Sequence, residues 1–529
     1  MKNKFLTIFY LPFLACSVFA QNLSDDYKVI SVNKKVAEIE YDQPYNSPLD
    51  NYVARIHLWI DGKYAPIYSE MIDALVPKSE TKPYPQKAAE NLLNSEIEKI
   101  VIYKDSIGLA FLKENPEYDY YLLGISQYEN GKWLAKGDGL CRAKTMSEAT
   151  QYIENTSIAI LKNLRQYYRQ QIVSTDTLAF VNYLKQNGKE PKEYLLEKLT
   201  DYPLVIYGEI HRRQLSWDFL KSIANDPKFT EICNTVFMEL PYHTQPLFDK
   251  FLNNNKLDTT LILSILETEQ QYGWQDKGEY EFIKELWKIN NKPKNKLRII
   301  PVDSQANWAE LYTPADWENY WANKKNRDST MAEIICNNLN LNDKRHCLFV
   351  VGMGHARKSS PDWWYISAGT ILTERLPQNA FFSIMPHTLI CDNSHWFGQF
   401  RNGLFDYIFE NQGNKPVAFN LKNSPFGKEP FDADHYVRFS GDCGIYEDYY
   451  DGYIFLYPLK DEPYEYELTE LFTDKFVEEL KRRAIMVGDK YGYYDIPLEE
   501  LSKEGIIEKI KSDKEKSGDR RYFEYFNTK

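Results

Sequence analysis

Two short motifs in this chain place a histidine three residues after a glycine. The stretch LVIYGEIH contains Gly208 and His211. A second stretch, CLFVVGMGH, contains Gly352 and His355. Each motif follows a run of β-branched and aromatic residues, which predicts that both histidines stand at the ends of buried strands. An imidazole at such a position can transfer a proton near neutral pH or bind a metal ion.

Carboxylates accompany these histidines. Glu209 lies two residues before His211, and alternate residues of an extended segment point to the same side, so both side chains can face one pocket. Two more apolar runs end in acids, TVFME at Glu239 and LRIIPVD at Asp303. A carboxylate beside an imidazole raises the pKa of the ring and orients it. This arrangement suits His211 to accept a proton from water or a hydroxyl group.

Several roles stay open for the other members. Glu239 is either a partner of His211 or a second base. His355 follows a glycine-rich turn, where it can act as the acid, stabilise an oxyanion, or bind a metal together with His211 and Glu239. The metal would be a divalent transition ion, with Zn and Mn both compatible with these ligands. Asp303 joins the cluster or caps a following helix, because Asp-Ser after a strand is also a helix start signal.

The four apolar runs alternate with helical stretches, which predicts an α/β domain with a mainly parallel sheet flanked by helices. The carboxyl ends of parallel strands lie along one edge, where such folds bind their ligands. The predicted helices include LAFVNYLKQN, LSWDFLKSIAND, and the segment from Arg327 to Leu341. An insertion from Pro246 to Leu286 is rich in helical patterns and should line the ligand-binding edge.

We divide the chain of 529 residues into four parts. They are a signal peptide at 1–20, an N-terminal α+β domain at 21–172, the α/β domain at 174–460, and a charged helical C-terminal segment at 461–529. In the N-terminal domain, YVARIHLWIDG and two later stretches are predicted strands, with a hairpin turn at Asn130 and Gly131. A helix is expected after Ser147. His57 stands alone in the first of these strands and is interpreted as structural.

The first residues have the pattern of an export signal. Lys2 and Lys4 precede an apolar run, and Val18-Phe19-Ala20 fits a cleavage site. The protein is therefore expected in the periplasm or cell envelope, with a lipid anchor at Cys16 as an alternative. No later segment has the roughly 20 apolar residues of a transmembrane helix. The net charge of −12 disfavours nucleic acids as partners and favours a small-molecule or peptide substrate.

Six cysteines remain beyond residue 20, and none forms a CxxC motif. One or two disulfides are possible in an oxidising compartment. Cys347 begins an apolar run and is interpreted as a core residue.

Together, the motifs resemble the superfamily of erythromycin esterase, the ChaN-type haem-binding lipoproteins and the TraB/Tiki metalloproteases. The residues that carry this resemblance are Gly208-Glu209-Ile210-His211, Glu239, Arg327-Asp328 with Met331-Ala332, and Gly352-x-x-His355. The resemblance covers about residues 175 to 460. It implies a site made of Glu209, His211, Glu239 and His355, supported by Arg327 and Asp328.

The chain departs from the esterase pattern directly after the first histidine, where Arg212 and Arg213 replace small residues. Two guanidinium groups favour an anionic ligand, although a solvated turn explains them equally well. The ChaN-type resemblance implies a haem site with Tyr242 or His243 as axial ligand and the arginines at the propionates.

Three functions follow from these patterns. The first is an exported hydrolase in which His211, tuned by Glu209 or Glu239, activates water, with or without a metal. The second is a haem-binding or iron-binding envelope protein. The third is an envelope protein that keeps the fold for surface interactions, since the chain has 40 tyrosines. The Glu209-x-His211 spacing favours the hydrolase.

Overall fold

The computed structural model describes the chain in twelve segments. They are residues 27–61, 86–103, 105–113, 121–141, 177–211, 213–291, 296–360, 366–391, 397–433, 444–459, 467–493 and 496–515. The expected signal peptide lies outside these segments, and so does the helix expected after Ser147. Residue Arg212 lies outside them as well. The described residues fall into two compact units, unit 1 at 27–141 and unit 2 at 177–515.

Unit 1 is a five-stranded antiparallel sheet with helices. The strand order is β1-β2-β3-β4-β5. The elements are β1 Tyr27–Lys35, α2 Pro48–Asp61, α4 Gln86–Asn94, β2 Glu96–Tyr103, β3 Ile107–Lys113, β4 Tyr121–Glu129 and β5 Lys132–Cys141. The predicted hairpin is confirmed: Asn130 and Gly131 have φ angles of 51° and 79°, as a tight turn with two left-handed residues requires.

The strand predicted at YVARIHLWIDG is wrong, because this stretch forms most of helix α2. Val53 and Ile56 are buried three residues apart, so the apolar residues follow a helical period despite their β-branched side chains. Pro48 is the first helical residue, where its missing N–H costs nothing. His57 therefore lies on a helix.

The sheet of unit 2 has seven strands in the order β13-β14-β10-β6-β9-β7-β8. All neighbours are parallel except β13 and β14, which confirms the predicted α/β class. The strands are β6 Leu204–Glu209, β7 Cys233–Pro241, β8 Arg298–Asp303, β9 His346–Gly352, β10 Phe381–Pro386, β13 Val417–Asn420 and β14 Gly452–Phe455. Two further pairs are β11 Leu389–Cys391 with β12 Phe397–Gln399, and β15 Tyr491–Tyr493 with β16 Ile496–Pro497.

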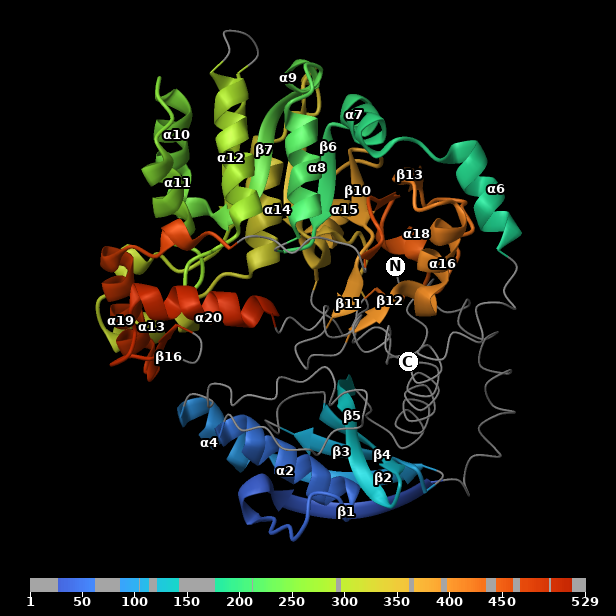
Figure 1. Ribbon diagram of the computed structural model, residues 1–529, viewed down its shortest axis with the longest axis vertical. Coiled ribbons are helices and arrows are strands. Elements are labelled where there is room, and N and C mark those ends of the chain that lie inside the picture. The colour runs from blue at the N-terminus through green and yellow to red at the C-terminus, as the bar shows by residue number, and fades with distance from the viewer. Residues whose placement is uncertain are drawn as a thin grey trace, which may run out of the picture. The chain divides into compact units, whose positions relative to one another are not determined.

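Helices cover both faces of this sheet. Figure 1 shows α8 Gln214–Ala224 and α12 Lys277–Asn290 in front of it, and α14 Arg327–Asn338 and α15 Ala368–Arg375 behind it. The other helices are α6 Leu178–Asn187, α7 Pro191–Asp201, α9 Phe229–Ile232, α10 Gln245–Asn253, α11 Thr259–Leu266, α13 Pro314–Ala322, α16 Leu404–Asn411, α18 Tyr446–Tyr449, α19 Asp474–Val487 and α20 Lys503–Glu515.

The strand order has a topological switch point at the neighbouring strands β6 and β9. After β6 the chain crosses toward β7, whereas after β9 it crosses the opposite way, toward β10. Right-handed crossovers in opposite directions use opposite faces of the sheet, so the two loops leave the carboxyl edge on different sides. Such a switch point is where open α/β sheets bind ligands.

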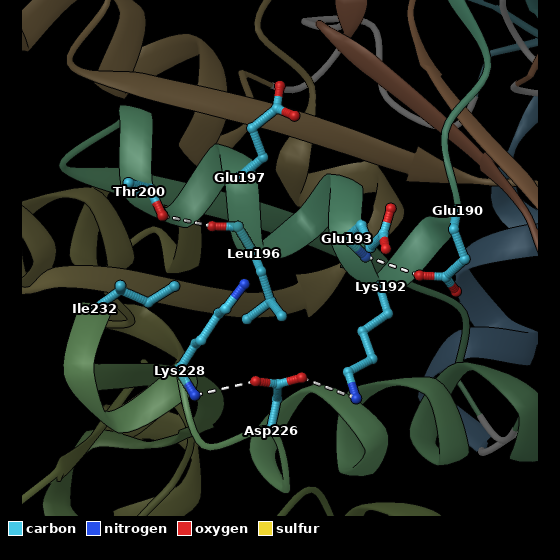
Figure 2. Close-up of a pocket in the computed structure, with 9 residues that line it drawn as sticks. All are labelled: Glu190, Lys192, Glu193, Leu196, Glu197, Thr200, Asp226, Lys228 and Ile232. Carbon is cyan, nitrogen blue, oxygen red and sulfur yellow. Dashed lines mark hydrogen bonds and ion pairs between the residues drawn. The ribbon is translucent and has the colours of Figure 1, made fainter.

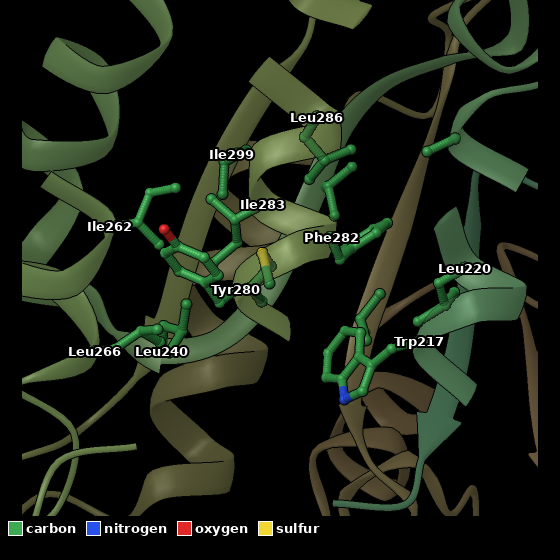
Figure 3. Packing of buried hydrophobic residues seen from close by; sticks show 14 of the residues in the cluster. Trp217, Leu220, Leu240, Ile262, Leu266, Tyr280, Phe282, Ile283, Leu286 and Ile299 are labelled. Carbon is green, nitrogen blue, oxygen red and sulfur yellow. The ribbon is translucent and has the colours of Figure 1, made fainter. Parts of the chain in front are cut away.

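The main core lies between the sheet and the helices in front of it. Figure 3 shows Trp217 of α8 beside Phe282 of α12, with ring centroids 5.7 Å apart. The same cluster includes Phe476 and Leu480 of α19, so the charged C-terminal segment also contributes to the core of unit 2. Burying each large apolar side chain contributes about 1.5–3 kcal/mol to stability.

Three cysteines have described side chains, and all three are free thiols: Cys233, Cys336 and Cys347. Cys347 is buried in β9, which confirms its interpretation as a core residue. Within the described segments, none of the helices has both the length and the apolar character that crossing a bilayer demands.

We predict that Phe282→Ala destabilises unit 2 by about 3–5 kcal/mol, because the cavity beside Trp217 cannot collapse fully. Urea unfolding measures the change. Leu178→Ala is the control, since Leu178 is 68% exposed and its loss should stay within about 0.5 kcal/mol. Equal effects of the two substitutions would contradict this account of the core.

Candidate functional site

The carboxyl edge of the sheet brings the predicted strand-end residues together. Glu209 ends β6, Glu239 lies near the end of β7, and Asp303 ends β8. His211 follows β6, and His355 lies in a 3₁₀ turn, Met353–Ala356, that directly follows β9. Because β9 lies between β6 and β7, both histidines lie at the switch point of the sheet.

Glu209 and His211 form a hydrogen-bonded pair. Nδ1 of His211 bonds Oε1 of Glu209, and the His211 ring meets the Trp274 ring edge-on, with centroids 5.0 Å apart. Glu209 is buried, and its Oε2 has no hydrogen-bond partner among the described residues. An unpartnered buried carboxylate oxygen is costly, so it indicates a place for a proton, a water or a cation.

The surroundings set the charge of this pair. The His211 side chain is 45% exposed, but its ring nitrogens face the protein. Removal from bulk water lowers the pKa of His211, yet the charge and hydrogen bond of Glu209, followed by the Glu239 charge, raise it to about 9. Burial raises the pKa of Glu209, partly offset by His211.

A second imidazole and carboxylate lie opposite. Nδ1 of His355 bonds Oδ1 of Asp328 at 2.7 Å, and the same oxygen accepts a bond from the Ala368 N–H. Nε2 of His355 lies 3.4 Å from Oε1 of Glu239. Burial lowers the pKa of His355, but the Glu239 and Asp328 carboxylates raise it by more. Asp328 thus orients His355 much as Glu209 orients His211.

Glu239 is the common partner of both imidazoles. Its Oε2 accepts the Gly352 N–H at 2.6 Å, and its Oε1 accepts Nη2 of Arg327 at 2.6 Å. Burial raises the pKa of Glu239, but the charges of His355, His211 and Arg327 lower it to about 2, so the carboxylate stays ionised.

Gly352 leaves the space between the first histidine and this carboxylate open. A Cβ at Gly352 would lie 3.1 Å from Nε2 of His211 and 3.2 Å from Oε2 of Glu239. A side chain here would wedge between the two groups, which explains why the motif has glycine at this position.

Asp303 and Arg327 support the cluster. Arg327 binds the fully buried Asp303 through two bonds, Nε to Oδ1 at 2.8 Å and Nη2 to Oδ2 at 2.6 Å. The same guanidinium reaches Glu239, so Asp303 fixes the cation that fixes Glu239. The alternative role of Asp303 as a helix N-cap is wrong, because the next α-helix, α13, begins only at Pro314.

The donor set is compatible with a metal ion. Ligand atoms of Glu209, His211 and Glu239 lie within 4.8 Å of one another. The sequence suggested His211, Glu239 and His355, so the geometry adds Glu209 as a candidate ligand. Both histidines have Nδ1 held by a carboxylate and Nε2 directed toward Glu239, and a carboxylate that orients the ring through its other nitrogen is typical of metal-binding histidines.

Three predicted ligand-binding residues lie apart from the cluster. Arg213 lines a small cavity of about 20 Å³ together with Ile210 and His387, and none of the four strand-end residues lines it. Tyr242, 44% exposed, and His243 form a 3₁₀ turn after β7. Burial lowers the pKa of His243, and its Nε2 is buried with no partner among the described residues.

Sequence reasoning missed two residues of the loop between α11 and α12. Trp274 covers one edge of His211. Glu269 is buried, its Oε2 has no partner in the described part of the chain, and burial with the Asp303 charge raises its pKa well above the usual value. The sequence indicated only a helix-rich insertion here, from Pro246 to Leu286. It did not indicate that this loop brings Trp274 to His211 at the carboxyl end of β6.

A larger groove, of about 560 Å³, lies elsewhere. Figure 2 shows it between α7 and the segment around Asp226, where Asp226 pairs with Lys192 at 2.9 Å. Helices α7 and α9 end just before β6 and β7 begin, so this groove borders the amino ends of the strands. It is therefore separate from the Glu and His cluster.

No family model and no curated protein matches this sequence. The chain is similar to a solved structure of a succinoglycan biosynthesis protein, at 12% identity and a TM-score of 0.38, over 53% of this chain and 97% of that one. It is also similar to a mutant of erythromycin esterase EreC in its open conformation, at 10% identity and a TM-score of 0.32, over 55% of this chain and 95% of that one.

A third similar structure is ChaN of Campylobacter jejuni with cofacially bound haem, at 14% identity and a TM-score of 0.26, over 38% of this chain and 87% of that one. Two groups that the sequence motifs resemble are thus among the similar solved structures. At these identities and TM-scores the likenesses carry no argument about activity, which rests on the site itself.

We predict that Arg327→Met destabilises unit 2 by about 3–5 kcal/mol, because it leaves the Asp303 charge buried without a cation. Arg327→Met combined with Asp303→Asn should recover part of the loss. Urea unfolding provides the measurement, with Lys288→Met as control, since Lys288 is 52% exposed and pairs at the surface. An Arg327 variant as stable as the Lys288 variant would refute the role of this ion pair.

Proposed function

We propose that this chain is a hydrolase in which His211 activates water. One observation carries the proposal: the Glu209 and His211 pair lies at the switch point of the sheet, with Nε2 of His211 beside Glu239 across Gly352. Substrates in this scheme are small-molecule esters or lactones, or peptides. The export-like pattern of residues 1–20 supports a location in the periplasm or cell envelope.

The proton chemistry follows from the hydrogen bonds. Glu209 accepts the Nδ1–H of His211, which leaves Nε2 as the nitrogen that accepts a proton. In its neutral form, His211 removes a proton from water as the water attacks the carbonyl carbon. The Glu209 carboxylate then stabilises the imidazolium that forms.

Cationic groups lie where negative charge would develop on the attacked oxygen. Despite burial, the Glu239 and Asp328 carboxylates raise the pKa of His355, and Arg327 is a permanent cation. Their shared partner Glu239 is already fixed by the Gly352 N–H, so the three groups are arranged before substrate binds. Pre-arranged charge of this kind is a major source of catalysis in hydrolases.

A divalent metal ion fits the same residues. Nε2 of His211, the carboxylate of Glu239 and the unpartnered Oε2 of Glu209 or Nε2 of His355 would hold it. Bound there, it would supply a lower pKa for water and polarise the carbonyl. His211 and His355 must be neutral to act as ligands, so protons and metal compete for this site.

We predict that kcat/KM rises with pH up to about 9 when metal is chelated, because His211 is mostly protonated at pH 7. His211→Asn should lower turnover on the order of 10²–10⁴-fold. Glu209→Gln should shift the rise to lower pH, because it removes the largest charge that raises this pKa. A panel of ester, lactone and peptide substrates provides the assay. Undiminished turnover by folded His211→Asn protein would disprove the proposal.

For the metal-assisted form, we predict that Zn or Mn binds the full chain in stoichiometric amount and more tightly as the pH rises, because binding displaces the His211 proton. Elemental analysis and calorimetric titration measure this. Glu239→Gln should weaken binding by at least about tenfold, whereas Asp218→Asn, on the surface of α8, should not. Equal metal content in both variants would rule out this site.

Haem binding is the alternative, and one observation favours it. Tyr242 is exposed at the end of β7, and a phenolate is a suitable haem ligand. His243 does not fit this role in the observed conformation, since its Nε2 is shielded from solvent. A haem titration tests the alternative: a Soret shift that Tyr242→Phe abolishes would support it, and no shift would remove it.

A further inference from the structure

The loop over the site, residues 267–276, adopts a conformation that its own sequence does not favour. It connects α11 to α12 and carries Trp274, the residue that meets the His211 ring. Gln270 and Gly273 both have left-handed φ angles, 48° and 74°. The left-handed conformation is strained for a non-glycine residue such as Gln270, so contacts from elsewhere must hold the loop.

Those contacts come from the C-terminal segment. The buried guanidinium of Arg483, on α19, donates from Nη1 to the carbonyl oxygen of Glu267 at 2.8 Å and to that of Gln271 at 3.3 Å. A weaker bond reaches the Gln270 carbonyl at 3.5 Å. Nε of Arg483 bonds Glu479 at 2.8 Å, which fixes the guanidinium plane. One side chain therefore ties three carbonyls of this loop to α19.

Apolar contacts and further bonds complete the attachment. Gly273 packs so closely on α19 that a Cβ would lie 2.8 Å from Cζ of Phe476. On the far side of Trp274, the Gln275 carbonyl accepts the Leu468 N–H at 3.0 Å, and Nε2 of Gln275 donates to the Tyr493 hydroxyl at 2.8 Å. The loop is thus held on both sides of Trp274 by residues beyond position 467.

We propose that the C-terminal segment contributes to the site by holding the loop that carries Trp274. Arg483 is then a positioning residue, which holds Trp274 against His211. The contribution of this contact to turnover rests on the proposed hydrolase function. The contact itself does not, because it can be measured without substrate. Lysine cannot replace Arg483 fully, since an ammonium has one nitrogen and cannot bond the loop carbonyls from one nitrogen and Glu479 from another.

Arg482 provides a matched control on the same helix. It also binds backbone carbonyls, those of Leu311 at 2.5 Å and Trp308 at 2.8 Å, and it shares Glu479 with Arg483. Arg482 does not bond the loop that carries Trp274 directly, and it is linked to that loop through Trp308, whose Nε1 donates to the Gln270 carbonyl at 2.7 Å. Substituting either arginine removes a charge and carbonyl bonds from α19, but Arg483 should affect Trp274 more.

The test uses the full chain labelled with 5-fluorotryptophan, with the Trp274 resonance assigned from Trp274→Phe. We expect Arg483→Met to shift or broaden this ¹⁹F resonance, Arg483→Lys to do so less, and Arg482→Met to have a smaller effect than Arg483→Met. An unchanged Trp274 resonance in Arg483→Met would overturn the proposal. If Arg483→Met does not fold, the Trp274 resonance is compared between Arg483→Lys and Arg482→Lys. The proposal then requires a larger change in Arg483→Lys.

Turnover gives a second, independent reading. Arg483→Met and Trp274→Ala should each lower kcat on the order of tenfold or more, because small displacements of a catalytic group are costly. If Arg483 acts through Trp274, the double variant should be no slower than Trp274→Ala. A double loss equal to the product of the single losses would contradict this coupling. If the proposed hydrolase function is wrong, His211→Asn will leave turnover unchanged. The ¹⁹F result for Arg483 would still hold in that case.

Discussion

The site depends on one buried charge, the Glu239 carboxylate. Its ionisation is secured by Arg327, by the Gly352 N–H and by two imidazoles, and Arg327 is secured in turn by Asp303. A carboxylate removed from water would take up a proton without such partners. Each partner follows the carboxyl end of a parallel strand or begins the helix behind it, so the charge requires this strand order.

The same constraint explains why the two histidines are alike in their surroundings. Each ring has Nδ1 on a carboxylate and Nε2 toward Glu239, and in each case neighbouring negative charge overcomes the effect of burial on the pKa. At neutral pH a proton occupies His211 in the absence of another cation. Water activation and metal binding therefore depend on the same charged groups. In the first case His211 loses its proton as the pH rises, and in the second case a metal ion displaces that proton.

Much of the site and of the sheet could be predicted from the sequence, because apolar runs that end in glycines and polar residues are typical of strands in parallel sheets. Glu209, His211, Glu239 and His355 were placed at one edge by that pattern. The insertion of β9 between β6 and β7 could not be predicted, since strand order depends on packing between distant segments. Trp274 and Glu269 were missed for the same reason: their loop is held by α19, more than 190 residues away in the sequence. At residues 52–62, β-propensity was misleading because the period of the buried residues is helical.

The most direct test of the central claim is the titration of the His211 imidazole, followed by ¹⁵N NMR in metal-free protein. The account predicts a pKa near 9, with Nδ1 retaining its proton and Nε2 titrating, and a fall in this pKa in Glu209→Gln. A pKa close to 6.5 that is insensitive to Glu209 would contradict it, because His211 would then lack the carboxylate partner on which the proposed chemistry depends.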